Sequence, residues 1–478
     1  MLALLLAARL GSAHFAASGP PACQRKVLEG VLELHSFMYD DAREAFVEAQ
    51  KAAPCPIAFW GEAMTYDHPL WGEQDAASAR AALAKIPPGA TVSAMERGLI
   101  EAAQALYEQG HAAWLERLQR LHAELPGDDE VALFDALALF ANSRHGKDVK
   151  RAMEAAAIAL DVFERNPDHP GAAHYLIHAC DSPEHAVLAL KAARRYAQIA
   201  PAAAHALHMP SHIFVQLGMW SEVEQSNTAA FAASEEWVAR KKLPVSRADW
   251  HSFVWLAAAR LQLGRAGEVL PMIARAHKLG ESRLRAVQVE LAAMWLSETQ
   301  DWAHAEELLD LPPLASGETW ARLYLARARL EAAAVQGDDT RAAASAAEFS
   351  AAMARVAPEA ELSAELGPLT AAAKLAQAHS VRDSGSINDA IARTRELADA
   401  EDREVASGPA PWTPAREELG DLLLRSHRLV EAAKEFRLAL DKRPNRRHAL
   451  RGLAEAQRGA EDSRSAEDAQ AKPPAHAH

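Results

Sequence analysis

The chain has 478 residues, of which 50% are hydrophobic, 6% are aromatic and 109 are alanine. This length and apolar content exclude a wholly disordered chain, and the alanine excess, about three times ordinary usage, favours closely packed helices over sheets. The formal net charge of -14 gives no general basis for holding a phosphate backbone, so we expect no nucleic-acid partner. Histidine is also abundant, with 21 residues, about double ordinary usage.

The first 22 residues indicate either a weak signal peptide or the extension of a frayed helix. A short apolar run over residues 1–8 precedes the small residues 11–13, which are typical of a signal-peptidase site, but the run lacks a positively charged start. We therefore predict a periplasmic or secreted protein, with a cytoplasmic one as the alternative. No segment approaches the roughly 20 apolar residues of a membrane span, so we expect no transmembrane segment.

The two ends of the chain share a spacing pattern. Gly30, Tyr39, Ala42, Phe46, Ala49 and Pro54 can be laid over Gly420, Leu429, Ala432, Phe436, Ala439 and Pro444 with all intervals equal. Small residues let two antiparallel helices approach, an aromatic ring fills the gap between them, and proline blocks continuation of the second helix. The pattern resembles the tetratricopeptide repeat (TPR), a helical hairpin of 34 residues.

Weaker copies of the pattern recur between the two ends. They are centred near Gly218, Gly264, Trp302, Gly337 and Gly385. We predict an all-α fold, a right-handed α-solenoid of about eight TPR-like hairpins whose concave groove is lined by the first helix of each pair. The predicted parts are N-terminal hairpins over 23–165, a histidine-rich segment over 166–265, C-terminal repeats with a capping helix over 266–459, and a disordered tail over 460–478.

Two of the three cysteines flank the first predicted hairpin. Cys23 opens its first helix and Cys55 follows the end of its second helix. Antiparallel helices bring these two points together, so a disulfide is geometrically plausible and would fit export. The alternative is a pair of unrelated cysteines. Cys180 has no evident mate, and we interpret it as a small buried hydrophobe.

Histidines gather in the middle of the chain, where seven of the 21 lie between residues 169 and 212. His174 and His178 are four residues apart, which places them about 40° apart around a helix, and Asp181 falls on the same stripe. Apolar packing gains nothing from repeated imidazoles. This stripe is therefore a candidate part of a metal site.

The next hairpin begins with a second histidine stripe. His205, His208 and His212 follow the i, i+3, i+7 spacing and are expected to face the concave groove beside the first stripe. We predict a divalent transition metal (Zn, Cu, Ni or Fe) bound by His174, His178, His208 and His212. The additional candidate ligands or groove residues are Asp181, His185, His205, His251, His68 and Tyr175.

Other functions remain open at this point. The groove could bind a peptide or protein partner as a TPR adaptor without metal, with the histidines as polar contacts. A metal-dependent hydrolase or oxidase would share the same site, but the spacing selects no catalytic residue, and the oligomeric state is not indicated. The His174-x3-His178 pair lacks the glutamate of a zinc protease helix, because Tyr175 stands in its place.

The histidine-rich segment also resembles a group of bacterial TPR-containing proteins. The resemblance lies in a His-x3-His-Ala run at 174–179, a His-Met-Pro-Ser-His-Ile-Phe run at 208–214 and the run from Trp60 to Trp71. It covers most of residues 24–265 and is more specific than the general repeat pattern. It implies a specialised site without naming a reaction.

Overall fold

The computed structural model describes residues 9–52, 54–143, 148–356, 363, 365–404 and 407–471, with side chains to residue 461 except that of residue 283. The described fold is all-α, as predicted; its one strand pair is β1 (Asp67–His68) and β2 (Glu73–Gln74), antiparallel with Asp67 opposite Gln74. None of the described helices combines the length and apolar character needed to cross a bilayer. The chain divides into two compact units: unit 1 is residues 1–214 and 225–243, and unit 2 is residues 215–224 and 244–478.

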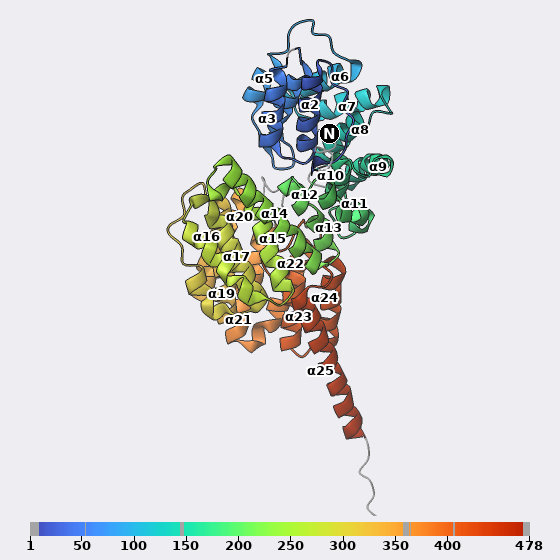
Figure 1. The fold of residues 1–478 in the computed structure, drawn as a ribbon. Coiled ribbons are helices and arrows are strands. Elements are labelled where there is room, and N and C mark those ends of the chain that lie inside the picture. Colours follow the sequence, from blue (N-terminus) through green and yellow to red (C-terminus); the bar gives the residue numbers. More distant parts are fainter. Residues whose placement is uncertain are drawn as a thin grey trace, which may run out of the picture. The chain divides into compact units, whose positions relative to one another are not determined.

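Unit 1 is a run of consecutive antiparallel helices, drawn from blue to green in Figure 1. They are α2 (Pro21–His35), α3 (Tyr39–Gln50), α4 (Ile57–Met64), α5 (Ala76–Leu83), α6 (Ala94–Gln109), α7 (His111–Glu124), α8 (Asp129–Ala141), α9 (Val149–Arg165), α10 (Pro170–Ala179), α11 (Ala186–Ile199) and α12 (Ala204–His208). Each helix packs on the next, and α2 also packs on α10. This long-range contact places the first hairpin beside the histidine-rich segment.

Unit 2 continues with helical hairpins, coloured from green to red in Figure 1. Two helices, α13 (Pro210–Gln216) and α14 (Trp220–Lys241), contribute residues to both units, so the unit boundary divides the predicted 166–265 segment. The others are η1 (Val245–Arg247), α15 (Trp250–Gln262), η2 (Ala266–Glu268), α16 (Leu270–Leu279), η3 (Ser282–Leu284), α17 (Arg285–Thr299), η4 (Trp302–His304), α18 (Ala305–Leu308), α19 (Thr319–Gln336), α20 (Asp339–Val356), α21 (Leu366–Arg382), η5 (Ser384–Ser386), α22 (Ile387–Glu401), α23 (Ala415–Arg425), α24 (Leu429–Lys442) and α25 (Arg447–Ala471).

The same aromatic packing occurs at both ends of the chain. The ring of Phe46 lies against Gly30 and Gly61, and a Cβ added to Gly30 would be 2.8 Å from that ring. The ring of Phe436 lies in the same way against Gly420 and Gly452. Glycine is needed because the ring occupies the space of a side chain on both neighbouring helices. The predicted TPR-like hairpins are therefore confirmed at both ends.

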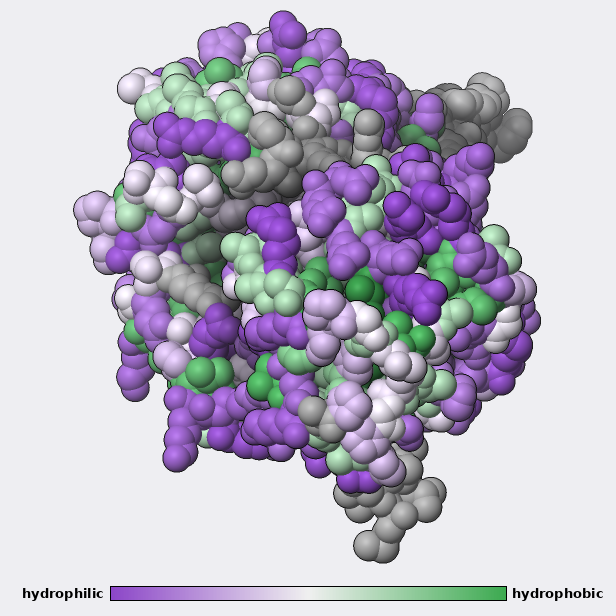
Figure 2. Space-filling model, turned by 90° about the horizontal axis from the view of Figure 1, so that it is seen from above, coloured by the Kyte–Doolittle hydropathy of each residue, from purple (hydrophilic) through white to green (hydrophobic). Residues whose placement is uncertain are grey.

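Alanine accounts for much of the buried surface between helices. Ala152, Ala155 and Ala159 form the buried face of α9. Such small side chains let helix backbones approach closely, which explains the excess of alanine. On the face seen in Figure 2, hydrophilic residues dominate and hydrophobic residues show between them.

The structure describes part of each predicted terminal segment. Residues 9–20 pack into unit 1: Phe15 stacks on Trp60 with ring centroids 5.8 Å apart, and the Ser12 amide donates to the carbonyl of Asp168 at 2.8 Å. Residues 1–8 of the expected signal peptide lie outside the described residues. At the other end, α25 continues past Gly459 through residue 471, within the predicted tail. Residues 472–478 of that tail are outside the described part.

The geometrically plausible disulfide is present in the structure. Cys23 and Cys55 are joined, with their Cα atoms 5.8 Å apart, and both residues are buried. The bond links the start of α2 to the residues before α4. Cys180 is free and buried, as expected for a small apolar side chain.

Candidate metal centre

Three imidazoles converge inside unit 1. His174 and His178 project from α10, and His205 projects from α12. The Nε2 atom of His174 lies 3.0 Å from Nε2 of His178 and 3.2 Å from Nε2 of His205. Nitrogen ligands at about 2.05 Å from a tetrahedral ion are about 3.3 Å apart, so these spacings suit a common ion. His205, predicted as a supporting residue, thus meets His174 and His178 directly.

The protonation of His174 is fixed by a backbone contact. Its Nδ1 lies 2.6 Å from the carbonyl oxygen of His35, at the end of α2. A carbonyl oxygen only accepts hydrogen bonds, so Nδ1 carries the proton and Nε2 of the neutral ring presents a lone pair. A hydrogen bond from the distal ring nitrogen to a carbonyl is the usual support of a metal-ligating histidine. The packing of α2 on α10 makes this contact possible.

The environment keeps the three imidazoles neutral. Burial lowers the pKa of His174 to about 3. Burial, followed by the neighbouring imidazoles, holds the pKa values of His178 and His205 well below the usual value. Neutral imidazole is the form that binds a metal ion, so these rings need lose no proton at pH 7 to act as ligands.

Aromatic side chains surround the three rings. Phe37 packs against all three, with centroid distances of 4.4 Å to His174, 5.8 Å to His178 and 5.6 Å to His205. Its backbone has a φ of 54°, a left-handed conformation that is costly for a bulky residue. Tyr196 also stacks on His174 at 5.4 Å. The turn after α2 therefore adopts an unfavourable backbone conformation that places an aromatic ring over the imidazoles.

The remaining two predicted ligands form an adjacent pair. Nε2 of His208 lies 3.2 Å from Nε2 of His212. The rings of His178 and His212 are 5.9 Å apart, and those of His205 and His208 are 6.1 Å apart. Five imidazoles are therefore contiguous in unit 1. They form a triad (His174, His178 and His205) and a pair (His208 and His212), whereas the predicted ligands are His174, His178, His208 and His212.

The structure also places three of the additional candidate residues, His68, His185 and His251. His68 places its ring nitrogens 3.1 Å from Glu73 and 3.2 Å from the carbonyl of Thr65. His185 lies at the start of α11, with Nδ1 2.8 Å from the Ser182 hydroxyl. His251 is exposed on α15 and belongs to unit 2.

Tyr175 belongs to a separate buried network in unit 1. Its hydroxyl donates to Nδ1 of His35 at 2.8 Å. Nε2 of His35 and Nε2 of His169 then donate to the two oxygens of Glu130, at 2.8 and 3.1 Å. Burial alone would raise the pKa of Glu130, but the two imidazoles hold it well below the usual value.

His35, Glu130 and His169 bring their ligand atoms within 4.8 Å of one another, as metal ligands would. The hydrogen bonds already use both carboxylate oxygens and both His35 nitrogens. We therefore interpret this group as a structural link between α2, α8 and α10. It supports the triad through the carbonyl of His35.

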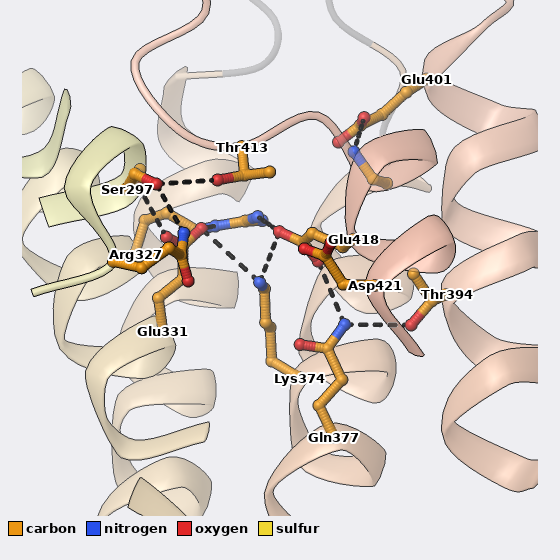
Figure 3. A network of polar contacts seen from close by, with 12 residues as sticks. Ser297, Arg327, Glu331, Lys374, Gln377, Thr394, Glu401, Thr413, Glu418 and Asp421 are labelled. Carbon is orange, nitrogen blue, oxygen red and sulfur yellow. Dashed lines mark hydrogen bonds and ion pairs between the residues drawn. The ribbon is translucent and has the colours of Figure 1, made fainter. Parts of the chain in front are cut away.

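Unit 2 contains a buried polar network of a different kind, shown in Figure 3. Arg327 donates to Glu331 at 2.5 Å, and Lys374 donates to Glu418 at 2.6 Å. Gln377 adds a hydrogen bond of 3.0 Å to Glu418. The two cations and two carboxylates balance one another, so this network needs no added ion.

Several residues of the site have no short-range signal in the sequence. Asn227, on α14, accepts from Nδ1 of His208 at 2.7 Å, and His35 and Glu130 contact the site only because α2, α8 and α10 pack together. The repeat spacing predicts that the histidines lie on the first helix of their hairpins. It does not predict which hairpins pack against one another.

Comparison with known proteins gives only distant similarities. No protein-family model matches the chain, and no curated protein matches it in sequence. The chain is similar to the solved structure of the APC/C hetero-tetramer Cut9-Hcn1 (13% identity, 91% of this chain and 76% of that one, TM-score 0.38). It is also similar to the human IFIT1 dimer with m7Gppp-AAAA (13% identity, 94% of this chain and 91% of that one, TM-score 0.37). A further similar structure is yeast Tom70 (10% identity, 94% of this chain and 99% of that one, TM-score 0.36). At these TM-scores the likeness does not bear on function.

Proposed function

We propose that this protein is a helical-repeat scaffold that binds a transition metal in unit 1. The ligands are the Nε2 atoms of His174, His178 and His205. The observation that carries the proposal is the convergence of these atoms at 3.0 and 3.2 Å around the lone pair of His174. The specific resemblance to bacterial TPR-containing proteins is part of the same proposal.

The ligand chemistry limits the choice of ion. Neutral imidazoles suit Zn, Cu, Ni or Fe, whereas Mg and Ca prefer oxygen ligands. The contact from His174 to the His35 carbonyl orients the ring, and burial favours the neutral form. Three protein ligands also leave a coordination position for water or another molecule.

Metal content tests the proposal directly. The full chain would be purified from medium containing these four metals and analysed for bound metal per chain. We expect at least one ion in the wild type and in His277→Ala, a matched control whose exposed imidazole lies in unit 2. We expect a clear loss in a His174→Ala, His205→Ala double variant. Wild-type protein with far less than one ion, or equal content in both variants, would contradict the proposal.

We also propose that the chain works in an oxidising compartment, such as the periplasm or the exterior of the cell. The Cys23–Cys55 bond supports this, since such bonds are rare in reducing compartments. Alkylation of the denatured native-source protein without reductant should label one thiol, that of Cys180. Labelling of all three cysteines would refute it.

A further inference from the structure

The His208–His212 pair differs from the triad in the side chains that contact its Nδ1 atoms. Nδ1 of His212 lies 2.7 Å from a carboxylate oxygen of Asp181. Nδ1 of His208 lies 2.7 Å from the amide oxygen of Asn227. Both partners are acceptors, so each Nδ1 carries the proton of its ring. The two Nε2 atoms are then both unprotonated in the neutral rings.

These two lone pairs face each other at 3.2 Å. Two acceptors at that distance repel unless a positive charge lies between them, either a shared proton or a metal ion. The spacing is close to the roughly 3.3 Å expected for two nitrogens on one tetrahedral ion. Carboxylate support of the distal nitrogen is also typical of metal-ligating histidines.

We propose that His208 and His212 hold a second transition-metal ion, which makes the centre dinuclear. This inference rests on the proposed function, because the first ion is the one bound by the triad. The ring distances of 5.9 Å from His178 to His212 and 6.1 Å from His205 to His208 place the second position beside the first. The carboxylate of Asp181 offsets part of the added charge.

Two imidazoles do not fill the coordination of a transition metal. Further ligands, such as water or a small oxygen-containing molecule, would complete it. A single ion can activate a bound water, and two adjacent ions can in addition hold such a ligand between them. A dinuclear centre therefore gives the site a chemical capacity beyond simple metal storage.

Zinc stoichiometry separates the two ions. The full chain would be stripped with a chelator, reloaded with Zn2+, passed through gel filtration and analysed. We expect two ions per wild-type chain and one in a His208→Ala, His212→Ala variant. A wild type that saturates at one ion, lost in His174→Ala, His205→Ala and kept in the other variant, overturns the second ion but leaves the proposed function. A wild type with one ion that is lost in both variants also overturns the second ion. A wild type that binds no ion overturns both the second ion and the proposed function.

A milder variant guards against misfolding. Asp181→Asn keeps the side-chain shape but can donate to Nδ1 of His212, so the useful tautomer is no longer fixed. We expect affinity for the second Zn2+ to fall about 10- to 100-fold in calorimetric titration, with the first ion unchanged. Asp168→Asn is the matched control, because that carboxylate pairs with Arg195 at an exposed site of the same unit. Equal second-site affinities in the two variants would overturn the inference.

Discussion

The two units bury polar side chains in opposite ways. In unit 2, Arg327 and Lys374 face Glu331 and Glu418, so each charge has a built-in counter-charge. In unit 1, five imidazoles gather with their Nε2 atoms directed at one another. In the first arrangement the charges are balanced by protein atoms alone. The second lacks a fixed positive charge, which the proposed metal ion would supply.

Both clusters use the same position of the repeat. The network of unit 2 comes from α19, α21 and α23, each the first helix of a hairpin, and the triad comes from α10 and α12. Alanine-rich packing brings these helices close enough for polar side chains to meet. The repeat thus supplies the geometry, while the residue types decide between a structural network and a ligand site.

The largest expected effect comes from breaking the complete network. Arg327→Met keeps the volume but leaves Glu331 and Glu418 with Lys374 as the nearby cation, and we expect a loss of about 3–5 kcal/mol in unfolding free energy. Urea unfolding monitored by circular dichroism measures it. Arg341→Met is the control: its pair with Glu306 is exposed, so we expect about 0–1 kcal/mol. Equal losses in the two variants would mean that the buried network stabilises the fold no more than the exposed ion pair does.

The second effect is the completion of unit 1 by metal. Zn2+ at 100 to 1,000 times its dissociation constant should raise the unfolding free energy by about 2.7–4.1 kcal/mol per bound ion. The part of the increase that comes from the triad's ion should be lost in the His174→Ala, His205→Ala variant. The whole increase should persist in Arg327→Met, whose defect lies in unit 2. Thermal unfolding with and without chelator gives the measurement. If the melting temperature of the wild type is the same with and without chelator, metal does not stabilise unit 1, and the proposed difference between the two units is wrong.

The third effect is a loss of stability in acid, expected for protein from which a chelator has removed the metal. The pKa of His174 is about 3 in the folded state, below its unfolded value near 6.5. The unfolded state therefore binds more protons between these values, and stability falls as the pH drops below about 6.5. At pH 5 this one group should cost about 2 kcal/mol. Urea unfolding at pH 7 and pH 5 checks the sign, and a His174→Gln variant should show a weaker dependence.

The fold was largely predictable from residue spacing. The intervals around Phe46 and Phe436 are local, and each implies a hairpin in which the ring packs on glycine. The histidine stripes were predictable for the same reason. What spacing could not give is the packing of α2 on α10, because that contact depends on the accumulated rotation of several hairpins.

The sequence did not predict which histidines approach one another. His205 was predicted as an additional ligand or groove residue. In the structure Nε2 of His205 approaches His174, whereas Nε2 of His208 approaches His212, although Met209 between α12 and α13 keeps helical backbone angles. The roles of His35 and Asn227 depend on distant segments and have no local signature.

The smallest effect distinguishes the structural network of unit 1 from its ligand site. Tyr175→Phe removes the hydroxyl that donates to Nδ1 of His35, and we expect a loss of about 0.5–1.5 kcal/mol, the usual net value of one hydrogen bond. Zinc stoichiometry should stay unchanged, because the His35 carbonyl that orients His174 is a backbone atom. A variant that loses bound zinc while remaining folded would instead place Tyr175 in the metal centre, in agreement with its prediction as an additional ligand or groove residue.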